Sequence, residues 1–204
     1  MKILVLAAHT DDETLGCGSS IAHWVAKGYQ VHVLCFSTCY ESLPAEYRGW
    51  GDTEPVITER ELGDACDILG CTFSIHEHPV RNFPEHRQSI LDVLTYYKTH
   101  YKPDLVVGPS LHDVHQDHRT VAEESRRCFW RNCNIISYNL PWNCDGFKAN
   151  LFVESTYADY LFLQVAGEAY ISQQPKMTEF INRKICLIGA NGDKEGFEVI
   201  RWSF

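Results

Sequence analysis

Residues 5–16 read VLAAHTDDETLG, and in this stretch an apolar run passes directly into a histidine and three acidic residues. Residues 2–8 are almost wholly apolar and predict one buried strand, whereas residues 11–26 carry apolar positions at helical spacing. His9 and the three acidic residues that follow therefore fall in a strand-to-helix turn. At the carboxyl end of a strand in an open α/β sheet, side chains face the crevice where ligands bind.

This turn has two interpretations. A histidine nitrogen beside carboxylate oxygens suits a divalent ion such as zinc. Alternatively, Asp11, Asp12 and Glu13 cap the helix and complement its dipole. The turn taken alone does not decide between these roles.

Residues 103–118, PDLVVGPSLHDVHQDH, repeat the arrangement, because a short apolar strand at 104–108 again ends in histidines and aspartates. A doubly wound sheet reverses direction beside its first strand, so strands 2–8 and 104–108 are expected to be neighbours. His9, Asp12 and His118 would then converge. Two histidines and one carboxylate leave a position open for water, as in catalytic zinc sites.

The two motifs together resemble those of the PIG-L/LmbE family of zinc-dependent de-N-acetylases. The resemblance is carried by HTDDE at 9–13, by Gly16 and Gly18, and by HQDH at 115–118. The resemblance extends to TERE at 58–61, to Leu69-Gly70 and to KPDLV at 102–106. It is weaker at residues 172–173 and 195–198. The family usually has proline where this chain has Thr10, and since proline stiffens a turn, a slightly looser turn is expected here.

The resemblance implies a catalytic metal, Zn²⁺ or another divalent ion, held by His9, Asp12 and His118. It further implies that Asp11 is the general base, and adjacent residues in a turn do point differently, one to the ion and one to its water. A metal would polarise the substrate carbonyl and lower the pKa of water toward about 7. The alternative for Asp11 is a helix cap.

His115 and His118 are three residues apart at a predicted helix start and therefore lie on one face. With His118 on the metal, His115 is expected to donate to the developing oxyanion or the leaving amine. Asp117 is expected to fix the tautomer and charge of His115. Asp117 would also cap the helix, and both roles can hold together.

The long segment 38–55 has no predicted secondary structure, and long loops in compact domains are usually functional or mobile. It contains Tyr40, Arg48 and Trp50, whose side chains suit sugar stacking and hydroxyl binding. These three are the candidate substrate-binding residues. A plain surface loop or a subunit contact is the alternative.

The alternation of strands and helices predicts an α/β fold, a Rossmann-like three-layer sandwich with a mainly parallel central sheet. The 204 residues, 45% of them hydrophobic, suit a single deacetylase-like domain over 1–204. Gly16 and Gly18 are expected to let the first helix pack closely on the sheet. The aromatic segment 157–170 is predicted to be core or a subunit contact. The expected strands are 2–8, 30–37, 72–77, 104–108, 134–139 and 150–154, and the expected helices are 13–27, 56–70, 87–101 and 118–130.

Composition excludes several classes of protein. The net charge of −9 disfavours nucleic-acid binding, which relies on basic patches. No Gly-x-Gly-x-x-Gly loop, membrane-length apolar run or signal peptide is present, so a cytoplasmic protein is expected. Nine cysteines, an odd number without a Cys-x-x-Cys pair, indicate reduced thiols.

The two motifs and the family that they resemble imply a hydrolase that removes acetyl from an N-acetylated amino sugar or sugar conjugate. A metal-binding but inactive relative is one alternative. A hydrolase of another amide or of an ester is the second. Homo-oligomerisation is expected only by analogy with the family.

Overall fold

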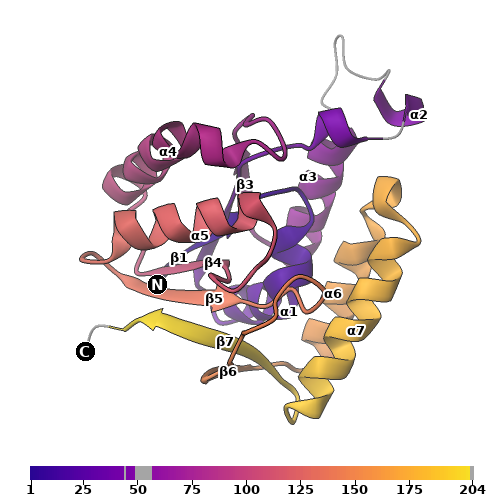
Figure 1. The fold of residues 1–204 in the computed structure, drawn as a ribbon. Coiled ribbons are helices and arrows are strands. Elements are labelled where there is room, and N and C mark those ends of the chain that lie inside the picture. The colour runs from indigo at the N-terminus through magenta and orange to yellow at the C-terminus, as the bar shows by residue number, and fades with distance from the viewer. Residues whose placement is uncertain (44, 49–56, 203–204) are drawn as a thin grey trace.

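The computed structural model describes residues 1–43, 45–48 and 57–202. Within these residues seven strands form one sheet in the order β3-β2-β1-β4-β5-β7-β6 (Figure 1). The first five strands along the chain pair in parallel, whereas β7 runs antiparallel to both β5 and β6. The strands are β1 (Lys2–Ala7), β2 (Gln30–Cys35), β3 (Thr72–Ile75), β4 (Leu105–Pro109), β5 (Asn134–Tyr138), β6 (Leu151–Glu154) and β7 (Lys194–Arg201).

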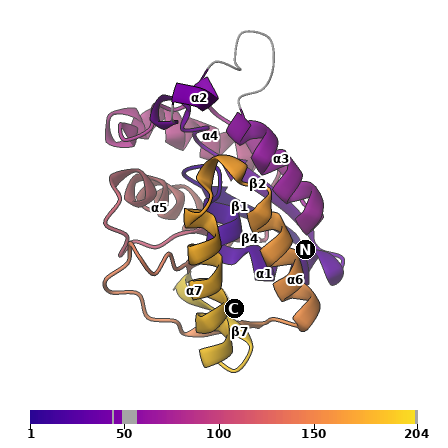
Figure 2. The same ribbon diagram turned by 90° about the vertical axis from the view of Figure 1, so that its right-hand side faces the viewer.

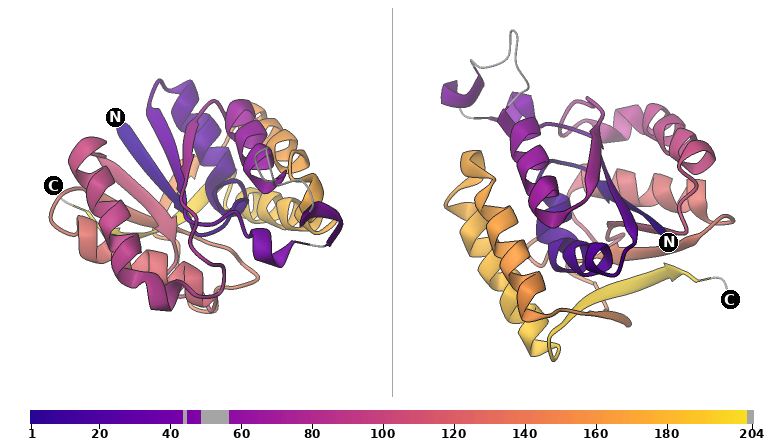
Figure 3. Two further views of the ribbon diagram at one scale, coloured as in Figure 1. Left: turned by 90° about the horizontal axis from the view of Figure 1, so that it is seen from above. Right: turned by 180° about the vertical axis from the view of Figure 1, so that it is seen from behind.

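Helices cover both faces of the sheet, which confirms the predicted α/β class. One layer contains α1 (Asp12–Ala26), α3 (Ile57–Leu69), α6 (Tyr157–Glu168) and α7 (Lys176–Ala190). The other contains α4 (Arg87–His100) and α5 (Gln116–Phe129). Figure 3 shows the two layers on either side of the strands, and Figure 2 looks onto α3, α6 and α7. The short α2 (Ala45–Arg48) lies apart from the sheet (Figure 1). None of the described helices combines the length and apolarity needed to cross a membrane.

The central strand β1 explains why its sequence is almost continuously apolar. Val5 and Ala7 belong to the core beneath α1, whereas Leu4 and Leu6 belong to the core beneath α4 and α5. All four side chains are fully buried. A strand covered on both faces needs apolar residues at every position instead of alternate ones.

The predicted neighbourhood of the first and fourth strands is confirmed. β1 pairs with β2 on one side and with β4 on the other, in a register that places Val5 opposite Val107. Because the strands are parallel, their carboxyl ends meet at one edge of the sheet. The turn after β1 and the segment after β4 therefore lie side by side.

The last third of the chain contains structure that the sequence pattern did not define. Most of the aromatic segment 157–170, for which no helix or strand was predicted, forms α6, which begins with a capping box between Thr156 and Asp159. Part of the aromatic segment is core, since Leu163 and Tyr170 are fully buried. Tyr157 remains 77% exposed, so the outer face of α6 stays available for contacts. Helix α7 and strand β7 were not predicted.

The two glycines of α1 have different partners. A Cβ added at Gly16 would lie 2.4 Å from the Tyr138 ring of β5, which confirms close packing on the sheet. A Cβ at Gly18 would instead lie 2.9 Å from Leu163 of α6, so the prediction for Gly18 was wrong in its partner. Gly18 allows α6 to pack closely on α1, and this role could not be predicted because the sequence did not reveal α6.

Replacing Gly16 by alanine should lower the free energy of unfolding by about 1–3 kcal/mol, because the added methyl overpacks the Tyr138 ring. Gly189→Ala in α7 is the matched control. A Cβ there meets no described atom within 4 Å, and alanine favours a helix over glycine. Urea unfolding measures both variants. Equal stability of the two would contradict the packing role of Gly16.

Candidate active site

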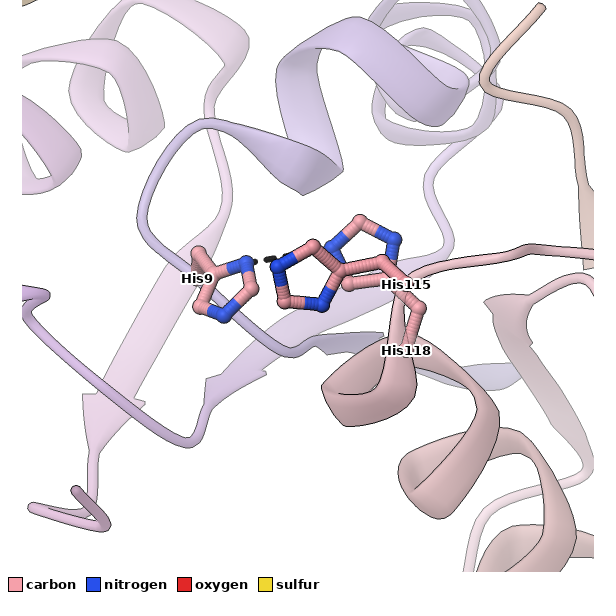
Figure 4. A group of neighbouring side chains, drawn as sticks. All are labelled: His9, His115 and His118. Atoms are coloured by element: carbon pink, nitrogen blue, oxygen red, sulfur yellow. Dashed lines mark hydrogen bonds between the residues drawn. The ribbon is translucent and has the colours of Figure 1, made fainter. Parts of the chain in front are cut away.

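The residues singled out in the two sequence motifs meet at the carboxyl edge of β1 and β4. His9 comes from the turn after β1, His115 is the N-cap of α5, and His118 lies in the first turn of that helix. Figure 4 shows the three imidazole rings gathered between these elements. They line a cavity of about 300 Å³ together with Asp11 and Asp12. The predicted convergence of His9, Asp12 and His118 therefore occurs in the structure.

Three atoms of this group are spaced like the ligands of one metal ion. His118 Nε2 lies 3.0 Å from His9 Nδ1 and 3.3 Å from Asp12 Oδ2, and His9 Nδ1 lies 3.7 Å from Asp12 Oδ2. Tetrahedral ligands about 2.0–2.2 Å from zinc are separated by roughly 3.4 Å. The donor set and its spacing thus fit a divalent cation.

His115 adds a further nitrogen to the same cluster. One ligand atom each of His9, His115 and His118 lies within 4.8 Å of the others. His115 Nδ1 accepts the backbone N–H of Asp117 at 3.2 Å, which leaves its Nε2 as the donor. Burial, together with neighbouring His118 and His9, lowers the pKa of His115. His115 is therefore a neutral imidazole with Nε2–H available to the cavity.

Two further carboxylates orient the histidine rings. Asp117 Oδ2 accepts His9 Nε2 at 3.0 Å, and Asp113 Oδ2 accepts His118 Nδ1 at 2.7 Å. Both carboxylates are buried. Each histidine thus donates one ring N–H to a carboxylate and turns its other nitrogen toward the shared point, as metal-binding histidines commonly do.

The carboxylate of Asp117 was expected to contact His115, and its contact with His9 corrects that prediction. The side chain points back across the loop at 81–83, where the N–H groups of Arg81 and Phe83 donate to it at 2.6 and 3.2 Å. These hydrogen bonds and the one from His9 lower the pKa of Asp117, although burial acts in the opposite direction. The tautomer of His115 is instead set by the Asp117 backbone.

Sequence reasoning missed Asp113. Its Oδ1 accepts the backbone N–H of His115 at 2.8 Å while its Oδ2 holds His118. The signal was an aspartate five residues before His118 in a His/Asp run, but only the fold decides which histidine it reaches.

Replacing Asp113 by alanine should weaken metal binding about 10- to 100-fold, the usual contribution of such an orienting carboxylate. The physical reason is that the His118 ring loses the acceptor for its Nδ1–H. Competition with a chromophoric chelator measures the affinity. Asp104→Ala, at the opposite edge of the sheet where Asp104 binds the Lys2 N–H, is the control and should leave the affinity unchanged. If the Asp113 variant bound metal as tightly as the wild-type protein, the orienting role of Asp113 would be refuted.

The electrostatics of the cluster favour a bound cation. Burial alone would lower the pKa of His118, but Asp12 and Asp113 raise it to about 9. A metal must therefore displace a proton from His118, and the affinity for the metal should fall as the pH decreases.

Burial, with Asp12 and Glu13 nearby, raises the pKa of Asp11 well above its usual range.

Asp11 has a special backbone conformation. Its φ of 111° lies in the left-handed region, which costs a residue other than glycine about 1–3 kcal/mol. Asp11 occupies the N-cap position of α1, yet its side chain makes no capping hydrogen bond to the described residues. Asp11 lines the cavity instead. The helix-cap alternative is therefore wrong as an explanation of its side chain.

The predicted substrate residues are only partly placed by the structure. Tyr40 lies in a 3₁₀ turn (Tyr40–Ser42) and lines a smaller cavity of about 180 Å³ beside the main one. Trp50 and the side chain of Arg48 lie outside the described residues.

The wall of the main cavity includes residues that no sequence motif indicated. Trp142 and Phe180 stack with ring centroids 3.8 Å apart and planes at 7°. Lys176 Nζ lies 5.2 Å from the centroid of the Phe180 ring. Gln173 and Cys39 also line this cavity. Cys39 and Trp142 come from separate segments, whereas Gln173, Lys176 and Phe180 come from α7 and the turn before it.

Comparison with known proteins agrees with this geometry. The family described as PIG-L, GlcNAc-PI de-N-acetylase, matches residues 4–129. The chain is also 27% identical over 176 residues to the uncharacterized deacetylase YaiS of Escherichia coli K12, which covers 81% of this chain and 87% of that protein.

Solved structures share the fold at low identity. The N,N'-diacetylchitobiose deacetylase of Pyrococcus horikoshii superposes with a TM-score of 0.74 at 20% identity, over 98% of this chain and 83% of that one. The 4-carboxy-2-hydroxymuconate hydratase GalB of Pseudomonas putida KT2440 also superposes with a TM-score of 0.74, at 16% identity, over 100% and 97% of the two chains. Because a hydratase has the same architecture, the fold alone does not fix the reaction.

Proposed function

The chain belongs to the PIG-L family, and on this premise we propose that it is a metal-dependent hydrolase that removes the acetyl group from an N-acetylated amino sugar or sugar conjugate. One observation carries the proposal. Three ligand atoms, of His9, Asp12 and His118, lie within 3.7 Å of one another at the edge of a cavity that Asp11 and His115 also line. Metal-dependent amide hydrolysis needs a metal ion that activates water and, next to it, a base and a hydrogen-bond donor.

We propose Zn²⁺ as the bound ion, with His9 Nδ1, Asp12 Oδ2 and His118 Nε2 as its protein ligands. Two neutral nitrogens and one carboxylate form a donor set that zinc commonly has in hydrolases. When bound, zinc supplies a Lewis acid for the acetamide carbonyl and lowers the pKa of water.

The remaining polar groups have separable roles in this proposal. Asp11 takes the proton of the attacking water, because its carboxylate lines the cavity next to a ligand without filling a cap role. His115 donates its Nε2–H to the oxyanion that develops on the acetyl carbonyl, since its Nδ1 already accepts the Asp117 N–H. Asp117 and Asp113 hold the rings of His9 and His118.

The sugar is proposed to lie against the wall that the stacked pair of Trp142 and Phe180 forms, since an aromatic surface suits a pyranose ring. Tyr40, Arg48 and Trp50 remain predicted substrate contacts from the segment 38–55. Since Trp142, Gln173 and Phe180 lie beyond the matched residues 4–129, the last third of the chain contributes to the same cavity. This supports a single functional domain over residues 1–204.

The reaction is tested with metal-loaded protein and a panel of N-acetylglucosamine, its nucleotide, lipid and inositol conjugates, and other acetamido sugars. Release of acetate with a new primary amine is expected for at least one of them. Full metal occupancy without turnover on the panel would indicate an inactive relative. Cleavage of esters or other amides alone would move the protein to a different class of hydrolase.

A further inference from the structure

The catalytic turn is connected to the segment that follows α6 by one buried carboxylate, that of Glu13. Glu13 is fully buried. Its Oε1 accepts the hydroxyls of Thr14, at 2.7 Å, and of Tyr170. Its Oε2 accepts the backbone N–H of Asp11 at 3.3 Å. A single side chain thus joins Tyr170, which lies 157 residues away in sequence, to the backbone of Asp11.

Asp11 depends on such contacts because its backbone is strained. A residue other than glycine keeps a φ of 111° only where the surrounding structure holds it there. The Asp11 carbonyl accepts the Leu15 N–H at 2.9 Å, which any helix start would provide. The hydrogen bond on the Asp11 N–H is the one made by Glu13.

Tyr170 donates from a firmly held position. Its side chain is fully buried in the core between the sheet and the α1 layer. Two residues later, Glu61 of α3 accepts both the backbone N–H of Ser172, at 2.6 Å, and its hydroxyl, at 2.7 Å. The 3₁₀ turn Ile171–Gln173 is therefore fixed to α3 while Tyr170 reaches α1.

We propose that Tyr170 is a positioning residue for Asp11 and acts through Glu13. The proposal rests on the proposed function, in which Asp11 is the general base. The Tyr170 hydroxyl orients the Glu13 carboxylate so that its second oxygen meets the Asp11 N–H. Without that hydroxyl the carboxylate rotates, the Asp11 peptide relaxes from its strained conformation, and the base moves away from the water.

Tyr170→Phe tests this idea with the loss of one oxygen atom. A displacement of about 1 Å at a reacting group costs on the order of 100-fold in rate, so kcat should fall about 10- to 100-fold. KM and metal content should stay unchanged, because the three metal ligands are untouched. Tyr138→Phe is the matched control, since Tyr138 is equally buried and its hydroxyl donates to the Leu6 carbonyl at 3.0 Å.

A purely structural role predicts a different result. In that case both variants would lose melting temperature alike while kcat per folded, metal-loaded molecule stayed the same in each. A double-mutant cycle with Glu13→Gln adds a second criterion. Since Tyr170 acts through Glu13, the double variant should be no slower than Glu13→Gln alone. Unchanged kcat in Tyr170→Phe, or additive effects in the cycle, would overturn the proposal.

A crystal structure of Tyr170→Phe tests the coupling without any turnover. The Asp11 N–H should leave Glu13 Oε2, and the Asp11 φ should leave the left-handed region. An unchanged Asp11 would overturn the proposal. If the wild-type protein released no acetate from any substrate, the proposed function would fail, whereas this structural comparison would still decide whether Tyr170 positions Asp11.

Discussion

His118→Ala is expected to abolish both metal binding and acetate release. His118 Nε2 lies 3.0 Å from His9 Nδ1 and 3.3 Å from Asp12 Oδ2, so its removal leaves two of the three proposed ligands. The loss of affinity should exceed the roughly 10- to 100-fold effect of an orienting partner, because a ligand itself is lost. Elemental analysis after dialysis measures the metal content, and acetate release measures the activity.

The variant also leaves the buried Asp113 without its imidazole partner, so folding must be checked by circular dichroism. His112→Ala provides the control. His112 belongs to the same segment, but its side chain is 45% exposed and lies 3.6 Å from Glu198. The His112→Ala variant should keep full metal occupancy and full activity. A His118 variant that retained stoichiometric metal would refute the proposed ligand set.

The second large effect is expected for Asp11→Asn, which should keep its metal and lose about two to four orders of magnitude in kcat. That is the usual contribution of a positioned general base. Asparagine tolerates positive φ better than most residues, so the backbone at 111° should persist while the base is lost. The change therefore separates the chemistry of the carboxylate from the geometry of the turn.

Steady-state kinetics as a function of pH measure this effect. Burial beside Asp12 and Glu13 raises the pKa of Asp11, so the wild-type rate should fall as acid protonates that group. The variant should lose this dependence. Asp145→Asn, at an exposed loop position, is the control and should behave as wild type. If the Asp11 variant kept its metal and turned over at nearly the native rate, Asp11 would have a structural role and would not be the general base.

The sequence was sufficient for the first two-thirds of the fold. Strands such as β1 and β4 are buried on both faces, so their apolar runs are visible without any knowledge of their neighbours. The order of β1 and β4 follows from the chain reversal of a doubly wound sheet. The bounds differ by only a few residues. Helix α5, for example, begins at Gln116 instead of residue 118, which makes His115 its N-cap.

The last third resisted prediction for a physical reason. Helix α6 packs against α1 and α3 and leaves Tyr157 and Leu161 exposed, so its apolar residues do not follow one buried stripe. Its partner residues are in other helices, and Gly18 is explained only by Leu163. The periodicity of apolar residues reveals a helix that buries one face, and it does not reveal a helix that packs against several neighbours.

The three proposed metal ligands of the candidate site could be named from the sequence. His9, Asp12 and His118 follow two strand ends, and parallel strands bring those ends to one edge of the sheet. Which carboxylate orients which histidine ring depends on the folded structure. The hydrogen bond of Asp117 to His9 joins segments 108 residues apart, whereas that of Asp113 to His118 depends on how the five-residue segment between them folds at the start of α5. The same holds for Tyr170 and Glu13, because a hydrogen bond between distant segments leaves no periodic trace in the chain that forms it.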